Sequence, residues 1–106
     1  MKTINRIKAS EDFALAIKKG KTFSNESFVI HVHENEYGHT RIGISVSAKF
    51  CNAVNRNRVK RQIRAMCDLL VKYDEKALDV VIITKKKFLE LSFDDNKQNL
   101  EQLLSK

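Results

Sequence analysis

Residues 52–64 read Asn52-Ala-Val-Asn-Arg56-Asn57-Arg58-Val-Lys60-Arg61-Gln-Ile-Arg64, and they carry five cations and no acid. Apolar residues at intervals of four, three and four run through and beyond this stretch, at Val59, Ile63, Met66 and Leu70. This spacing predicts a long helix over residues 52–72 with one buried stripe. At about 100° per residue, one flank of the stripe carries Arg56, Lys60 and Arg64, with Asn57, Arg58 and Arg61 further round. The helix is therefore predicted to be half buried and half basic.

The positive charge extends beyond this helix. No Asp or Glu occurs between Glu36 and Asp68, and Arg41 and Lys49 bring the cations of that interval to seven. The formal net charge of the whole chain is also +7, so the remainder is close to neutral. Plain surfaces usually mix both signs, whereas a local positive field suits a polyanion.

Length and composition restrict the class of protein. A chain of 106 residues with 42% apolar and 31% charged content predicts one folded domain over residues 1–106. No apolar run approaches the roughly 20 residues of a membrane span, and the first twenty residues lack the apolar core of a signal peptide. We therefore expect a cytoplasmic protein. Cys51 and Cys67 would lie about 24 Å apart on one helix, so we interpret both as packed thiols.

The other elements follow from periodicity and from residues that end helices. Ser10 is predicted to cap a helix over residues 11–19 that Gly20 ends. Strands are predicted over residues 22–25, 28–34, 41–47 and 79–84, and the second and third of these are expected to be antiparallel neighbours. Ser92 is predicted to cap a last helix that buries Phe93, the Lys97 stem, Leu100, Leu103 and Leu104. The fold class is α+β, with one mixed four-stranded sheet packed by helices in the order α-β-β-β-α-β-α.

The second face of the third strand holds small and polar residues, Arg41, Gly43, Ser45 and Ser47. Two interpretations are open at this point. The face is either a wet side of an antiparallel sheet, or a surface with room for a ligand beside the basic helix.

A metal site is a weak interpretation of the histidines. His31 and His33 share one strand face, but a third ligand would have to come from His39 or Cys51, at no recognised spacing. Surface histidines on a nucleic-acid-binding sheet are the simpler account, so we predict no metal ligand in the protein.

Catalysis by side chains and a DNA-recognition helix are weak as well. Ser45 and Ser47 have no base at an identifiable spacing, and the basic interval has no paired carboxylates for Mg²⁺. A helix-turn-helix needs a short helix where this chain has strands. We therefore predict no catalytic residue and an RNA-binding surface, on which cations contact phosphate, Asn57 reads or positions, and Phe13 stacks on unpaired bases.

The motif Arg41-Ile-Gly-Ile-Ser-Val-Ser47 is followed by Asn52-Ala-Val and by Arg56-Asn57-Arg58-Val-Lys60-Arg61-x-Ile-Arg64. Together these resemble the bacterial ribonuclease P protein component, whose signature is Arg-Asn-Arg followed by Lys-Arg. The likeness covers almost the whole chain and includes Arg6-Ile7, Asp12-Phe13 to Gly20, Phe28-Val-Ile, Asp79-Val-Val-Ile-Ile and Leu91-Ser-Phe.

The resemblance implies a fold similar to the second domain of ribosomal protein S5, with a left-handed crossover through the long helix. Pattern alone would favour a right-handed one. It also implies two partners, a catalytic RNA and precursor tRNA, with one monomeric protein per RNA and no membrane. The implied reaction is removal of the 5′ leader by hydrolysis of one phosphodiester, carried out by the RNA subunit and the Mg²⁺ that it mainly holds.

The resemblance also implies which residues bind. Contacts with the catalytic RNA fall on Lys49, Asn52, Arg56, Asn57, Arg58, Lys60, Arg61 and Arg64. A cleft for the precursor tRNA leader, between the first helix and the sheet, falls on Phe13, Ile17, Val29, His31 and Ser45. An RNA-binding module without a role in cleavage and, more distantly, a stand-alone nuclease are the alternatives.

Three departures from the family pattern carry expectations. The family usually has an aromatic residue where Ile17 stands and a tyrosine where His31 stands. Because stacking on one base contributes about 1–3 kcal/mol, leader binding is expected to be weaker here or to prefer other bases. The usual Lys-Lys-x-Gly before Asn-Ala-Val is Ala48-Lys49-Phe50-Cys51 here, which alters the loop into the helix. Lys85-Lys86-Lys87 stands where the family has a basic stretch with proline.

Overall fold

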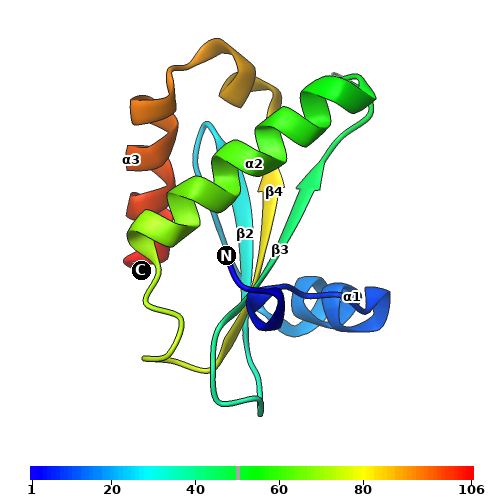
Figure 1. Cartoon of the computed structure of the whole chain (residues 1–106), viewed down its shortest axis with the longest axis vertical. Helices are drawn as coiled ribbons and strands as arrows, with labels where there is room; N and C mark the ends of the chain where they lie inside the picture. The colour runs from blue at the N-terminus through cyan, green and yellow to red at the C-terminus, as the bar shows by residue number, and fades with distance from the viewer. Residues whose placement is uncertain (50) are drawn as a thin grey trace.

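One four-stranded sheet in the order β1-β2-β4-β3 organises the chain. The computed structural model describes residues 1–49 and 51–106 (Figure 1). The strands are β1 Lys21–Ser24, β2 Phe28–Glu34, β3 Arg41–Val46 and β4 Leu78–Thr84. The helices are α1 Ser10–Lys19, α2 Ala53–Leu70 and α3 Phe93–Leu104, with short 3₁₀ turns η1 Thr3–Asn5 and η2 Lys86–Glu90.

The predicted pairing of the second and third strands is wrong, because β4 lies between β2 and β3. It pairs antiparallel with β2 and parallel with β3. The nearly continuous apolar run of β4 suits a central position, with a neighbouring strand on each side and one face in the core. In Figure 1, β3 and β4 point the same way, α2 crosses in front of them, and β4 lies to the left of β3. This arrangement is the left-handed crossover that the resemblance implied.

The core lies between one face of the sheet and the pair α2 and α3. The sheet contributes Phe28, Ile30, Ile42, Val46, Val80 and Ile82, and the helices contribute Val59, Ile63, Met66, Cys67, Leu100 and Leu103. The predicted stripe of α2 is confirmed, although Leu70 is only half-buried. The prediction that Phe93 is buried is wrong, because 37% of this residue is exposed at the start of α3.

Two of the three predicted helix starts are capped by side chains. The Asn52 side chain accepts a hydrogen bond from the Asn55 N–H at 2.9 Å, and Ser92 Oγ accepts one from the Asp95 N–H at 3.1 Å. Ser10 was expected to cap α1 but is its first helical residue, preceded by Ala9 without a side-chain cap. Such caps satisfy backbone N–H groups that no carbonyl of the helix can reach.

Gly20 ends α1 as predicted, but for a different reason. Its φ of −75° is accessible to any residue, so no left-handed turn requires glycine here. A Cβ at this position would lie 2.4 Å from the Ala16 carbonyl oxygen and 2.8 Å from that of Val32. Glycine therefore allows the end of α1 to lie directly against β2.

A buried polar side chain attaches α3 to the rest of the fold. Asn96 is 2% exposed; its Nδ2 donates to the Phe88 carbonyl at 3.0 Å, and its Oδ1 accepts from Ser27 Oγ at 2.8 Å.

Both cysteines are buried and free, as expected. None of the helices in residues 1–49 and 51–106 combines the length and apolar character of a membrane span.

Candidate nucleic-acid interface

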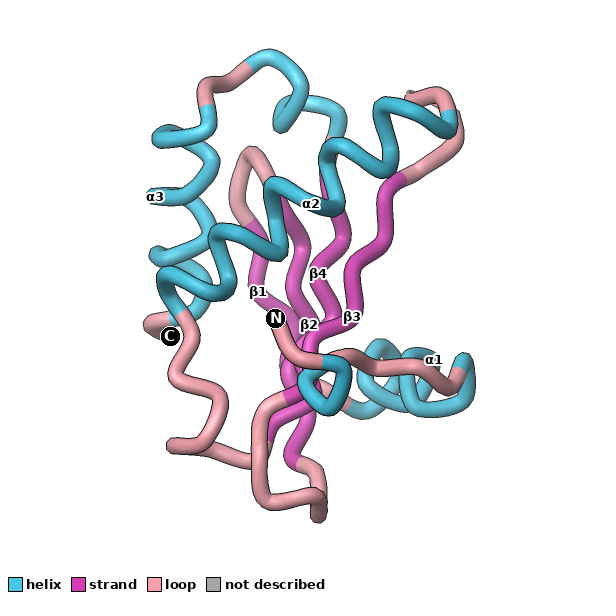
Figure 2. Tube along the Cα trace, in the orientation of Figure 1, coloured by secondary structure: helices cyan, strands magenta, loops and turns pink. Residues whose placement is uncertain are grey.

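The face of the sheet opposite α2 and α3 is only partly covered, by α1. The strand register aligns three rows of residues across this open face: Val29–Ile83–Ser45, His31–Val81–Gly43 and His33–Asp79–Arg41. Figure 2 shows α1 at the end of the sheet where β3 begins, and the start of α2 at the end where β3 finishes. The row of Val29, Ile83 and Ser45 is half-buried and stays accessible on the open face.

Close packing of Phe13 on Gly43 brings α1 onto this face. A Cβ on Gly43 would lie 2.6 Å from Cε2 and 2.8 Å from Cδ2 of the Phe13 ring. Glycine is thus required at this point of β3 by the ring above it. The small residues of the third strand therefore have two uses, because Gly43 receives a helix of the same chain while Ser45 faces open space.

Arg41 also links the beginning of α1 to the sheet. Its Nε donates to Asp79 Oδ1 at 2.8 Å, and its Nη2 donates to Asp79 Oδ2 at 2.6 Å and to Asp12 Oδ2 on α1 at 3.3 Å. The hydrogen bond with Asp79 raises the pKa of Arg41 above its usual range, against the cost of burial. The Tyr37 ring lies 4.0 Å from the guanidinium carbon.

Arg41 is therefore no part of a free positive surface. The interval from Glu36 to Asp68 lacks acids in sequence, but the fold places two carboxylates from outside the interval beside Arg41. Counting all seven cations as available was wrong, since the Arg41 charge is compensated inside the protein. Six remain: Lys49, Arg56, Arg58, Lys60, Arg61 and Arg64.

The five residues expected in the leader cleft come together on the open face. Phe13 and Ile17 come from α1, Val29 and His31 from β2, and Ser45 from β3. Ile17 is 39% exposed, and the other four are half-buried. His31 Nδ1 lies within hydrogen-bonding distance of Thr22 Oγ1 on β1, at 2.9 Å, which orients the ring and leaves Nε2 for another partner.

The basic flank of α2 has the predicted orientation. Arg56, Lys60 and Arg64 are half-buried beside the apolar stripe, whereas Lys49, Asn52, Asn57, Arg58 and Arg61 are exposed. Two of these eight side chains also bind within the protein. Arg56 Nη1 donates to the Cys51 carbonyl at 2.9 Å, and the Asn52 side-chain oxygen accepts the capping hydrogen bond, while its amide nitrogen can still donate to RNA.

A small hollow joins the basic flank to α1 around the edge of the sheet. It measures about 130 Å³, and its lining includes Lys60 and Arg64 from α2, Phe13 from α1, Gly43 from β3 and Arg6. Because β3 is an edge strand, no further strand separates these residues. Groups predicted separately from helix and strand patterns therefore form one continuous surface.

Two residues of this surface are missing from the predicted set. Ile83 lies between Val29 and Ser45, and alternation along β4 from Asp79 assigns it to this face. Arg6 is held next to Ile42 by a parallel bridge, with the Ile7 N–H donating to the Ile42 carbonyl at 3.0 Å. Only its occurrence in the family-like Arg6-Ile7 pair pointed to Arg6.

The histidines considered as metal ligands have other neighbours. The His39 ring lies 2.9 Å from the Ile4 carbonyl oxygen, and Cys51 is buried beside the core. Among the described residues, no group of three or more His, Cys, Asp or Glu could hold a metal ion.

In the altered loop before α2, the Lys49 N–H donates to Ser47 Oγ at 3.1 Å, and Phe50 lies outside the described residues.

Comparisons with known proteins agree along the whole chain. A protein-family model described as ribonuclease P matches residues 1–106. The chain is 40% identical over 105 residues to the ribonuclease P protein component of Mesoplasma florum, covering 98% of this chain and 96% of that protein. It also superposes on a Staphylococcus aureus RNase P protein mutant with defective mRNA degradation activity, with a TM-score of 0.86, 33% identity and coverage of 96% and 86%. It superposes on the Thermotoga maritima RNase P protein in complex with 1-(4-fluorophenyl)-2-thiourea with a TM-score of 0.84 and 31% identity. That match covers 95% of this chain and 98% of the other.

Proposed function

This chain belongs to the ribonuclease P protein family, and from that premise we propose that it binds the catalytic RNA and the 5′ leader of precursor tRNA. In doing so it promotes the endonucleolytic removal of the leader that gives the mature 5′ end of the tRNA. The observation that carries the proposal is the continuous surface from the basic flank of α2, around the edge of β3, to the open face beside α1.

The two parts of this surface suit different parts of the RNA. The side chains assigned to the catalytic RNA are Lys49, Asn52, Arg56, Asn57, Arg58, Lys60, Arg61 and Arg64. Six of these are cations without an acidic neighbour in sequence, which suits phosphate contacts and the release of counterions. Such contacts position the protein without reading the bases.

The open face beside α1 suits a single strand with unstacked bases. The side chains assigned to the leader are Phe13, Ile17, Val29, His31 and Ser45, together with Ile83. Phe13 can stack on a base, and the His31 ring, oriented by Thr22, offers a second planar surface. Because Ile17 cannot stack, fewer stacked bases are expected here than with two aromatics on α1.

The chemistry is assigned to the RNA partner. In this proposal the RNA subunit holds Mg²⁺, which supplies the charge stabilisation and activated water of phosphodiester hydrolysis. The protein holds the leader and neutralises phosphates near the cleavage point, which lowers the Mg²⁺ needed for binding. We further propose one protein monomer per RNA and a cytoplasmic location, with which the two free, buried thiols are consistent.

A reconstitution assay tests the function. The protein is mixed with a bacterial ribonuclease P RNA and precursor tRNA at low Mg²⁺, and 5′ cleavage is followed. We expect faster cleavage than with the RNA alone. No gain with folded protein that still binds RNA would instead support a binding module without a role in cleavage.

A matched pair of variants tests the RNA contacts. Arg61→Ala removes an exposed cation of the basic flank, and Lys72→Ala removes an exposed lysine beyond the other end of α2. Arg61→Ala should weaken RNA binding and reduce the slope of log K against log salt by about 1, while Lys72→Ala leaves the slope unchanged. Equal slopes for both variants would contradict a phosphate contact at Arg61.

A further inference from the structure

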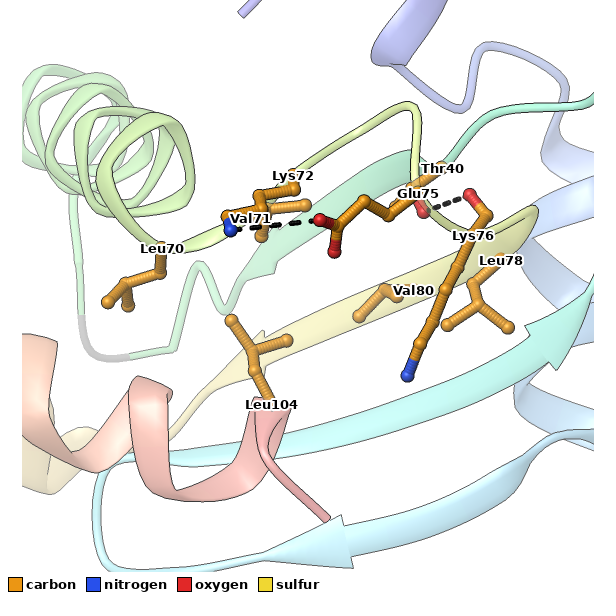
Figure 3. Close-up of a pocket in the computed structure, with 9 residues that line it drawn as sticks. All are labelled: Thr40, Leu70, Val71, Lys72, Glu75, Lys76, Leu78, Val80 and Leu104. Atoms are coloured by element: carbon orange, nitrogen blue, oxygen red, sulfur yellow. Dashed lines mark hydrogen bonds and ion pairs between the residues drawn. The ribbon is translucent and has the colours of Figure 1, made fainter.

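A second hollow lies beyond the other end of α2, between the last turn of α2, β4 and the end of α3 (Figure 3). It measures about 310 Å³. Its floor is apolar and consists of Leu70, Val71, Leu78, Val80 and Leu104. Its rim is polar and consists of Thr40, Lys72, Glu75 and Lys76. Small-molecule sites are typically pockets of a few hundred Å³ that are lined mainly by apolar side chains and carry a few polar groups in defined positions.

The rim is held in place by hydrogen bonds rather than left as a free loop. Thr40 Oγ1 donates to the Lys76 carbonyl at 2.8 Å, and the Thr40 N–H donates to the Tyr73 carbonyl at 2.7 Å. Lys72 Nζ lies 3.7 Å from Glu75 Oε1, so these two charges compensate each other. The segment after α2 therefore keeps a defined position above the apolar floor.

Lys76 supplies the uncompensated charge of this hollow. In Figure 3 its side chain extends across the hollow past Val80 and Leu78, with the ammonium above the apolar floor. No carboxylate among the described residues pairs with it. A lysine stem often covers apolar surface while its ammonium reaches water, but here the charge is at the mouth of a hollow large enough for a ligand.

The apolar surface and the positive charge both continue on the other side of Leu78. A neighbouring hollow of about 410 Å³ shares Leu78 and adds Phe23 and Val32 to the floor. Its lining also contains three lysines and one glutamate, namely Lys19, Lys21, Lys106 and Glu34. The charge around the combined apolar floor is thus positive, which favours an anion over a cation.

We propose that the hollow around Leu78 binds a small amphipathic anion. The apolar body lies on Leu70, Leu78 and Leu104, and a carboxylate or sulfonate group accepts a hydrogen bond from the Lys76 ammonium. This site is separate from the basic flank of α2. Arg56 near the start of α2 and Lys76 beyond its end are separated by most of a helix of 18 residues, which spans about 27 Å at ~1.5 Å per residue.

The test uses the full chain and two probes of the same shape, 2-naphthoate and the neutral 2-naphthamide. Methyl resonances of Leu and Val are followed by NMR during each titration. We expect saturable shifts at Leu70, Leu78 and Leu104, with naphthoate bound about fivefold more tightly than the amide, since a partly exposed charge pair contributes up to about 1 kcal/mol.

The variant Lys76→Met keeps most of the apolar stem and removes the charge. It should reduce the affinity for naphthoate to that for naphthamide and leave naphthamide binding unchanged, while Lys18→Met on α1 changes neither. The methyl spectrum itself reports whether each variant is folded. Shifts confined to the open face near Val29, no saturation, or equal affinities for the two probes in the unsubstituted protein would overturn the proposal.

Discussion

Gly43→Ala should damage the proposed leader cleft, although Gly43 is not among the residues proposed to contact the leader. The added Cβ would lie 2.6 Å from Phe13 Cε2, and ordinary contact begins at 3.4 Å, so the ring must retreat by about 0.8 Å. Ile7 Cδ1, at 3.3 Å, limits movement on the other side. Overpacking of this kind usually costs about 1–3 kcal/mol of unfolding free energy.

The functional effect follows from the displacement of the ring. If Phe13 stacks on a leader base, its displacement should weaken leader binding by up to the about 1–3 kcal/mol that one stacked base contributes. The assay compares the affinity of the ribonuclease P complex for precursor tRNA with a long leader and with a one-nucleotide leader. Only the long-leader affinity should fall.

Gly38→Ala is the matched control. Gly38 has a φ of +78° in the β2–β3 turn, so alanine is strained there, but nothing lies within 4 Å of the added Cβ. It should lower stability without changing the preference for a long leader.

A double-mutant cycle then isolates the contact. In a Phe13→Ala background the ring is absent, so Gly43→Ala should cost at least about 1 kcal/mol less than in the unsubstituted chain. Additive stability changes, together with an unchanged preference for the long leader, would refute the packing argument.

Three further results are expected. Asp79→Asn leaves the buried Arg41 guanidinium without its main partner and should lower the free energy of unfolding, measured in urea, by about 3–5 kcal/mol. Asp12→Asn removes only the half-exposed 3.3 Å contact and should lower it by at most about 1 kcal/mol. Equal losses for the two variants would contradict this account. Asn96→Leu should cost about 1–3 kcal/mol in the same assay, because Ser27 and the Phe88 carbonyl lose a buried partner; a neutral result would show that other contacts hold α3. Burial raises the pKa of the Cys67 thiol from 9.0 to about 12, so its contribution to stability is complete below pH 9 and is lost as the pH rises towards 12. The urea midpoint of the unsubstituted protein should therefore fall more steeply at alkaline pH than that of Cys67→Ala. Parallel pH dependences of the two midpoints would contradict this.

Much of the local structure could be predicted because its causes are local. The predicted cap at Ser92 acts on the N–H group three residues away, and the stripe of Val59, Ile63 and Met66 follows from helical periodicity. Alternation along β3 also assigned Arg41, Gly43 and Ser45 to one face correctly. The grouping of Phe13, Ile17, Val29, His31 and Ser45 as a leader cleft came from the family resemblance, and alternation alone did not predict it.

Strand order could not be obtained in the same way. Alternation assigns a side chain to a face but does not identify the neighbouring strand, and chain proximity suggested β2 beside β3. The insertion of β4 depends on contacts between residues about fifty positions apart, such as Val29 and Ile83. That insertion places Ile83 between Val29 and Ser45 on the open face.

The basic stretch itself shows the same division. The sequence alone determined that residues 52–64 form a helix with a buried stripe and a cationic flank, because spacing and charge are properties of neighbouring residues. Which of the cations are free depends on contacts between distant parts of the chain. Arg41 is compensated by Asp79, 38 positions away, whereas Lys60 and Arg64 line the same hollow as Phe13 at the edge of β3. The physical reason is that a charge is compensated by the residues within a few ångströms of it. The fold determines which residues these are, and their separation in sequence does not predict it.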